Sequence, residues 1–150
     1  MSTYVTLREE ILASPDRVFD VLCDLDRIER WAPDLVRVEK LTDGSFGPGT
    51  RWRETRRASG REFSEEFEVA TLEVNRAIEV LLDVTGEAAR RGRYRFRYEL
   101  EPTGGRTRVT VRGEIDGGGG VLETLARLFT GAMRRSITDD LRAMKRYIES

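Results

Sequence analysis

A long amphipathic helix is predicted at the C-terminal end of this 150-residue chain. After the four glycines at 117–120, apolar residues recur with the three- and four-residue spacing of one helical face. They are Leu122, Leu125, Ala126, Phe129, Met133, Ile137, Leu141, Met144 and Ile148. From Val121 to Glu149 such a helix would be about 43 Å long. Because it could not lie on a small sheet without crossing most of it, we expect a curved sheet that packs along the helix.

The rest of the chain predicts seven strands and two short helices. Val5–Leu12 has the pattern of a strand, and Ser14 followed by Pro15 is a typical helix start. A second short helix would be capped by Asp24 or Asp26. Further strands are expected near residues 35–41, 50–58, 61–74, 77–84, 92–101 and 107–116. Strands joined by short turns form an antiparallel meander, so the fold class is α+β, with one domain over residues 1–150.

The charge between residues 51 and 69 is accounted for by hairpin pairing. If Ser59-Gly60 is a two-residue turn, residues whose numbers sum to 119 lie opposite each other. One face then carries only pairs of opposite charge, namely Arg51 with Glu68, Arg53 with Glu66, and Arg57 with Glu62. A turn at Gly104-Gly105 gives the same result further on, with Arg93 opposite Asp116, Arg95 opposite Glu114, and Glu101 opposite Arg108. These arginines therefore indicate a solvated face, and a basic stripe for phosphates is the less favoured interpretation.

The other face of the first hairpin combines apolar and charged residues. Glu54 is expected opposite Glu65, with Arg56 beside them. Like charges directly opposite each other destabilise a sheet, so at least one carboxyl should have a raised pKa or contact the guanidinium. Such a group suits a wet or ligand-holding cavity. Two alternatives remain open: the groups reach water at the open end of the sheet, or the register slips by one residue.

Aromatic residues supply the expected walls of this cavity. Tyr94, Phe96 and Tyr98 share one face of their strand, and the long helix would add Phe129 and Met133. The candidate ligand-binding residues are thus Trp52, Glu54, Arg56, Phe63, Glu65, Phe67, Tyr94, Phe96, Tyr98, Phe129 and Met133. Leu72 and Leu81 are expected on the outward phase of their strands, where they would form a small patch that could support a homodimer.

Composition excludes several classes of protein. The net charge of −1 argues against a nucleic-acid partner, which would require an excess of clustered basic residues. The chain has no histidine, so it has no Ser-His-Asp triad, Cys-His pair or histidine-based metal site, and no cofactor is expected. Its single cysteine, Cys23, falls in an apolar helical pattern and is interpreted as a small buried hydrophobe.

No part of the sequence predicts insertion into a membrane. No stretch approaches the roughly 20 apolar residues of a membrane span, and the first ten residues have no signal-peptide core. We therefore expect a cytoplasmic protein.

The order of these elements resembles the START-like (SRPBCC) superfamily, within it the bacterial polyketide cyclase/dehydrase and lipid-transport group. The resemblance covers essentially the whole chain. It rests on Ala13-Ser14-Pro15 before Val18-Phe19, Trp31, Gly49-Thr50 with Trp52, and Glu101-Pro102 with Gly104-Gly105 and Thr107. It implies a helix-grip fold, with a seven-stranded antiparallel sheet around the C-terminal helix and an apolar cavity between them. Members bind lipids, steroids, quinones or polyketides, and some cyclise aromatic polyketides.

Three functions fit the sequence. The first is binding of one apolar or amphipathic small molecule between sheet and helix. The second is an aromatase/cyclase in which Glu54 or Glu65 is a general base and Arg56 stabilises the enolate. The third is a regulatory or chaperone-like protein that binds a macromolecule through its surface, supported only by Leu72 and Leu81.

Overall fold

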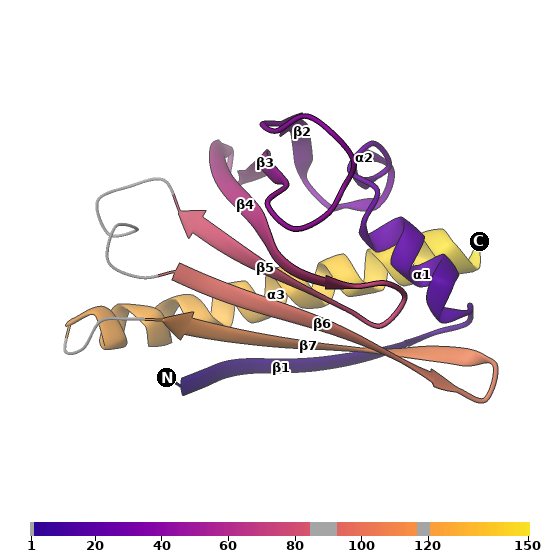
Figure 1. Ribbon diagram of the computed structural model, residues 1–150. Helices are drawn as coiled ribbons and strands as arrows, with labels where there is room; N and C mark the ends of the chain where they lie inside the picture. Colours follow the sequence, from indigo (N-terminus) through magenta and orange to yellow (C-terminus); the bar gives the residue numbers. More distant parts are fainter. Residues whose placement is uncertain (1, 85–92, 117–120) are drawn as a thin grey trace.

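The computed structural model describes the backbone of residues 2–84, 93–116 and 121–150, and the side chains of residues 5–82, 94–114, 131 and 133–150 (Figure 1). One antiparallel sheet has the strand order β1-β7-β6-β5-β4-β3-β2. Its strands are β1 (Ser2–Ile11), β2 (Leu35–Lys40), β3 (Arg51–Ala58), β4 (Arg61–Glu73), β5 (Ala77–Val84), β6 (Arg93–Thr103) and β7 (Arg106–Asp116). The helices are α1 (Pro15–Leu22), α2 (Ile28–Trp31) and α3 (Val121–Glu149).

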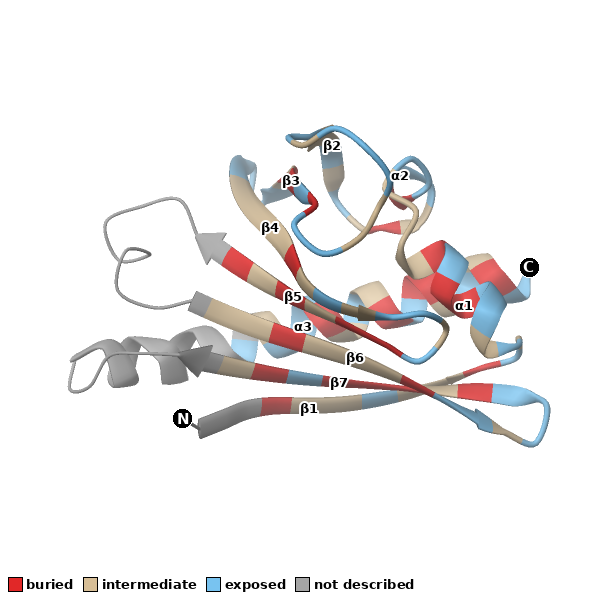
Figure 2. Cartoon of the chain, viewed as in Figure 1, coloured by how far each residue is buried: buried red, intermediate tan, exposed pale blue. Residues whose placement is uncertain are grey.

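The sheet curves around α3, and this confirms the predicted fold class. In Figure 1, α3 runs along the strands and ends near α1. The C-terminal half of α3 places its apolar face in the core through Ile137, Leu141, Met144 and Ile148. These side chains pack with alternate residues of the strands, which appear as buried bands along β5, β6 and β7 in Figure 2. Burial alternates along each strand because successive residues point to opposite faces of the sheet.

The two short helices connect β1 to β2. The backbone of Ser14 is extended and Pro15 is the first residue of α1, as predicted. The predicted cap of α2 is wrong: this helix begins after Arg27. Asp24 instead accepts the backbone N–H of Asp26 at 3.0 Å and forms an ion pair with Arg27 at 3.0 Å, so its carboxylate closes the turn that precedes α2.

Both predicted hairpin registers are confirmed. Arg51 pairs with Glu68 across β3 and β4, and all other pairs of this hairpin follow the same sum. Ser59 and Gly60 both have positive φ, 51° and 76°, as a type I′ turn requires. Gly104 and Gly105 turn the second hairpin in the same way, with φ of 55° and 85°. It pairs Arg95 with Glu114 and Glu101 with Arg108.

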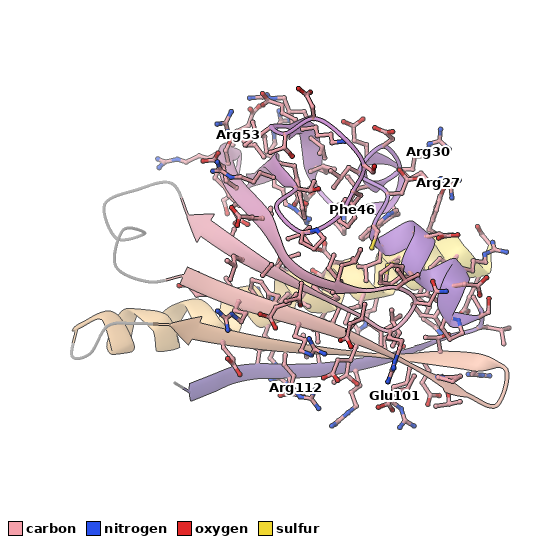
Figure 3. The ribbon with its side chains drawn as sticks, in the orientation of Figure 1. Arg27, Arg30, Phe46, Arg53, Glu101 and Arg112 are labelled. Atoms are coloured by element: carbon pink, nitrogen blue, oxygen red, sulfur yellow. The ribbon has the colours of Figure 1, made fainter. Side chains whose placement is uncertain are left out.

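The outer face carries half-exposed ion pairs. Arg53 lies 3.5 Å from Glu66 and Arg57 lies 3.2 Å from Glu62. Figure 3 shows Arg53 projecting outward from this part of the sheet, as Arg27 and Arg30 do near α2. Exposed pairs of this kind contribute roughly 0–1 kcal/mol each, so they fix the register more than they stabilise the fold.

The expected outward patch of Leu72 and Leu81 does not form. A bulge between Val69 and Thr71 shifts the register of β4 against β5, so Thr71 is exposed and Leu72 packs against the core. A bulge adds one residue to a strand and reverses the facing of the residues after it. Leu81 lies opposite Glu68 and Arg95 on the outer face. The two leucines therefore lie on opposite faces of the sheet.

Candidate functional site

A cavity of about 90 Å³ lies between the sheet and α3. Strands β3 to β6, α1, α2, α3 and the segment before β3 all contribute to its wall. The apolar lining consists of Leu22, Ile28, Trp31, Phe46, Trp52, Phe67, Ile78, Val80, Ile137, Leu141 and Met144. Four polar residues complete it: Glu54, Arg56, Tyr98 and Asp140. An apolar cavity with a few convergent polar groups is the usual form of a small-molecule site.

Arg56 is the centre of the polar group. Its Nε and Nη2 donate to Glu54 Oε2 at 3.3 and 3.0 Å. Nη1 and Nη2 donate to Asp140 Oδ1 and Oδ2 at 2.8 and 3.2 Å, and Nη1 also donates to the carbonyl of Pro33 at 3.4 Å. A guanidinium has five N–H donors, so all of those of Arg56 are used. Although burial opposes the charged form, Asp140 and Glu54 raise the pKa of Arg56 and keep it charged.

Glu54 is held from two sides and is only 4% exposed. Its Oε1 accepts the indole N–H of Trp52 at 3.1 Å, while Oε2 faces Arg56. Trp52, Glu54 and Arg56 are two residues apart along β3, so the strand's alternation directs all three to the cavity. The carboxylate thus has a fixed orientation.

Asp140 is the charged lining residue that the sequence interpretation did not assign. It lies three residues after Ile137 and four before Met144, on the face of α3 that packs against the sheet. Burial is the main cause that raises its pKa, and the guanidinium of Arg56 opposes this rise. A carboxylate on the apolar face of a predicted helix was the signal that could have found it, because buried charges are paired with few exceptions.

Glu65 lies directly across from Glu54, as predicted. Burial raises the pKa of its carboxyl to about 7, and the negative charge of Glu54 contributes to this rise. Glu65 does not line the cavity. Its carboxyl therefore lies beside the cavity lining, on the strand next to that of Glu54.

The other predicted site residues are divided between the cavity and its surroundings. Phe67 lines the cavity and stacks on Trp52 with ring centroids 5.4 Å apart. Tyr98 also lines it, and burial followed by the charges of Asp140 and Glu54 raises the pKa of its hydroxyl. Phe96 is buried in the core, where its ring takes the space left by the missing side chain of Gly113.

Three further predicted residues do not line the cavity. Tyr94 and Met133 are partly buried against the core without lining the cavity. Phe63 is 41% exposed. The side chain of Phe129 lies outside the described residues.

The N-terminal part of the chain supplies lining residues that the sequence interpretation had not assigned. Leu22 comes from α1, Ile28 and Trp31 from α2, and Phe46 from the segment before β3. The ring centroids of Phe46 and Trp52 are 6.0 Å apart. Nothing in their local pattern separates cavity wall from ordinary core, because only the tertiary arrangement brings them to the sheet.

Two indole groups of the lining differ in their partners. Trp52 donates to Glu54, whereas the Trp31 N–H is buried without a hydrogen-bond partner among the described residues.

Cys23 is partly buried against the core, and burial followed by the charge of Asp20 raises the pKa of its thiol to about 12. The thiol therefore stays protonated and unreactive.

Within the described ranges, no three or more His, Cys, Asp or Glu side chains are grouped so that they could hold a metal ion. Nor does any helix of the described part combine the length and apolar character needed to cross a membrane.

Comparison with known proteins identifies a family for the chain. The family described as polyketide cyclase / dehydrase and lipid transport matches residues 2–149. A search of curated proteins found no match.

Solved structures match the fold over nearly the whole chain. An aromatase/cyclase named Zhui, from Streptomyces sp. R1128, is 19% identical with a TM-score of 0.73, covering 97% of this chain and 92% of that one. A START superfamily protein from Mycobacterium smegmatis is 16% identical with a TM-score of 0.71, covering 97% and 96%. The protein TTHA0849 from Thermus thermophilus is 20% identical with a TM-score of 0.70, covering 96% and 95%. At these identities the likeness shows the fold.

Proposed function

Because this chain belongs to the polyketide cyclase/dehydrase and lipid-transport family, with the fold of START superfamily proteins, we propose that it binds one apolar or amphipathic small molecule between the sheet and α3. The cavity is the observation that supports this proposal. Its wall is apolar over most of its extent, and its polar groups come from β3, β6 and α3. A ligand would place an apolar ring or chain against Trp52, Phe67 and Met144 and a polar group near Asp140.

The volume of the cavity limits what it holds in its present shape. About 90 Å³ is well below the roughly 300–1,000 Å³ of pockets that enclose drug-sized ligands. It corresponds to a small ring or to the end of a longer molecule. A larger lipid, quinone or polyketide requires the surrounding elements to move apart on binding.

Native mass spectrometry of the protein purified from its own host tests this function. We expect a population with one bound small molecule, released by organic solvent and apolar in chromatography. A mass of the protein alone, together with a crystal structure in which side chains fill the cavity, would rule out ligand binding there.

A polyketide aromatase/cyclase is the second candidate. The carboxyl of Glu65 favours it, although this carboxyl lies beside the cavity lining and not in it. A pKa of about 7 suits a general base at neutral pH. Arg56 does not fit the enolate-stabilising role expected for it, because its five N–H groups already have partners. Among the lining residues, the protonated hydroxyl of Tyr98 is a better donor to an enolate.

Two substitutions separate binding from catalysis. If the glutamates are catalytic, Glu65→Gln and Glu54→Gln abolish turnover of a polyketide substrate while its affinity stays within a few-fold. If the glutamates have no chemical role, both variants keep ligand affinity within a few-fold and any turnover is unchanged. Glu62→Gln, which removes an exposed carboxylate from the same strand as Glu65, is the matched control.

A further inference from the structure

The polar end of the cavity has no free cationic donor among the described lining residues. Each N–H group of Arg56 already donates to Glu54, Asp140 or the carbonyl of Pro33. The side chain is also only 13% exposed. A ligand carboxylate could reach the guanidinium only by displacing one of these partners.

Acceptor sites, by contrast, remain available on Asp140. Each of its two oxygens accepts one N–H from Arg56, at 2.8 and 3.2 Å. A carboxylate offers about four lone-pair sites, so roughly two remain unused. Asp140 lines the cavity and is 24% exposed, in contrast to 5% for the side chain of Glu54. It is the member of the cluster that a ligand can reach.

The net charge of the polar end of the cavity is negative. Glu54 and Asp140 carry two negative charges against the single positive charge of Arg56, which leaves one negative charge, and ionised Glu65 adds another. Burial is the main cause that raises the pKa of the Tyr98 hydroxyl, and the charges of Asp140 and Glu54 add to this rise while Arg56 opposes it. The neutral donors of the lining, Tyr98 O–H and Trp31 N–H, do not change this balance.

We propose that the polar end of the cavity selects apolar ligands that donate a hydrogen bond, such as a hydroxyl or an amine, and rejects carboxylates, with Asp140 as the acceptor. This inference rests on the proposed ligand-binding function and names the chemistry of its ligand. It distinguishes alcohols, phenols and amines from free fatty acids and other carboxylic acids, which ionise at neutral pH and would place a second anion beside Asp140.

Three single-ring probes of similar size test the selection. Toluene has no polar group, phenol has a donor, and benzoate is an anion. The chain has two tryptophans, Trp31 and Trp52, and both line the cavity, so their indole N–H signals in ¹⁵N NMR spectra at pH 8 report binding. We expect benzoate to bind at least about tenfold more weakly than phenol.

A pair of substitutions assigns the effect to Asp140. Asp140→Asn removes the charged acceptor and frees part of Arg56, so the phenol-to-benzoate preference should fall by about tenfold or reverse. Asp139→Asn makes the same change one residue away, at an exposed position outside the cavity lining, and should leave the preference unchanged. The ¹⁵N spectrum of each variant shows whether it is folded, and the wild-type preference is decisive even if Asp140→Asn does not fold.

The outcomes distinguish the selection from the binding itself. If benzoate binds the wild-type protein as tightly as phenol does, the selection is wrong although ligand binding stands. If the preference is present but unchanged in folded Asp140→Asn, the assignment to Asp140 is wrong. If none of the three probes binds, the proposed function fails, and the selection fails with it.

Discussion

Among single residues, the two cavity tryptophans give a direct test of the polar cluster. Trp52 donates to the buried carboxylate of Glu54, whereas the Trp31 N–H has no partner in the described part of the chain. Replacing Trp52 by Phe leaves Glu54 short of one hydrogen bond, at a cost of roughly 1.5–3 kcal/mol for a charged acceptor. Trp31→Phe removes a similar volume and no hydrogen bond, so it should cost distinctly less.

Urea denaturation of the two variants measures this difference. Both variants exchange an indole for a phenyl ring. Trp52 is buried and stacks on Phe67 whereas Trp31 is only partly buried, so the difference includes packing as well as the hydrogen bond. Equal losses of unfolding free energy would mean that the bond from Trp52 to Glu54 does not stabilise the protein.

Glu65 predicts a pH dependence of stability. Its pKa is about 7 in the folded protein against 4.5 for an ordinary glutamate, so the folded state holds the proton more tightly. The contribution of this proton to the free energy of unfolding is fully present below pH 4.5 and is lost as the pH rises through about 7. The shift corresponds to at most roughly 3 kcal/mol.

The measurement compares wild type with Glu65→Gln at pH 5 and pH 8, with Glu62→Gln as the control for loss of one charge. Glutamine resembles the protonated carboxyl, so Glu65→Gln should gain stability relative to wild type at pH 8 but not at pH 5. A difference that stays constant with pH would show that the carboxyl of Glu65 is not perturbed.

Sequence reasoning located one half of the polar cluster and missed the other. Glu54, Glu65 and Arg56 could be predicted together because hairpin pairing is a local rule, set by a two-residue turn and checked by complementary charges. Asp140 is 84 residues from Arg56, and no local rule places a helix residue on a particular strand. That all five N–H groups of Arg56 already have hydrogen-bond partners follows only from that long-range contact.

Among the strands and helices, the bulge in β4 is the feature that strict alternation could not anticipate. It turns Leu72 to the core while Leu81 stays on the outer face. Leu72→Ala should therefore cost about 2 kcal/mol, near the lower end for buried leucines, because Leu72 is only partly buried. Leu81→Ala makes the same change on the opposite face and should cost less than about 1 kcal/mol.

Thermal or chemical denaturation of this pair checks the facing of β4. Similar losses from the two substitutions would indicate that Leu72 does not pack in the core.

The register of the first hairpin and the bounds of α3 could be predicted well, because both repeat a simple spacing over many residues. The part of α3 that faces the cavity could not be predicted in this way. Its face was predicted to contribute Phe129 and Met133. Met133 does not line the cavity, the side chain of Phe129 lies outside the described residues, and the described lining residues of α3 are Ile137, Asp140, Leu141 and Met144. Periodicity defines which face of a helix is apolar, but not how far the helix extends past each strand.

For the molecule as a whole, the fold leaves a small space where sheet, short helices and α3 meet. The family and the fold are established, and the proposed ligand binding rests on the cavity and its charge. Ligand binding in this cavity requires that the space be accessible to a ligand.

Filling the cavity is the most direct test. Val80 is 6% exposed and lines the cavity, so Val80→Phe places a ring in the space that a ligand would occupy. Val36→Phe adds the same atoms at a position that is 38% exposed and outside the lining. The measurement is the dissociation constant of toluene from the shifts of the Trp31 and Trp52 indole signals. We expect saturable binding to wild type and Val36→Phe, and binding at least about tenfold weaker to Val80→Phe. Absence of saturable binding to wild type, or unchanged affinity in Val80→Phe, would show that the cavity is not the binding site.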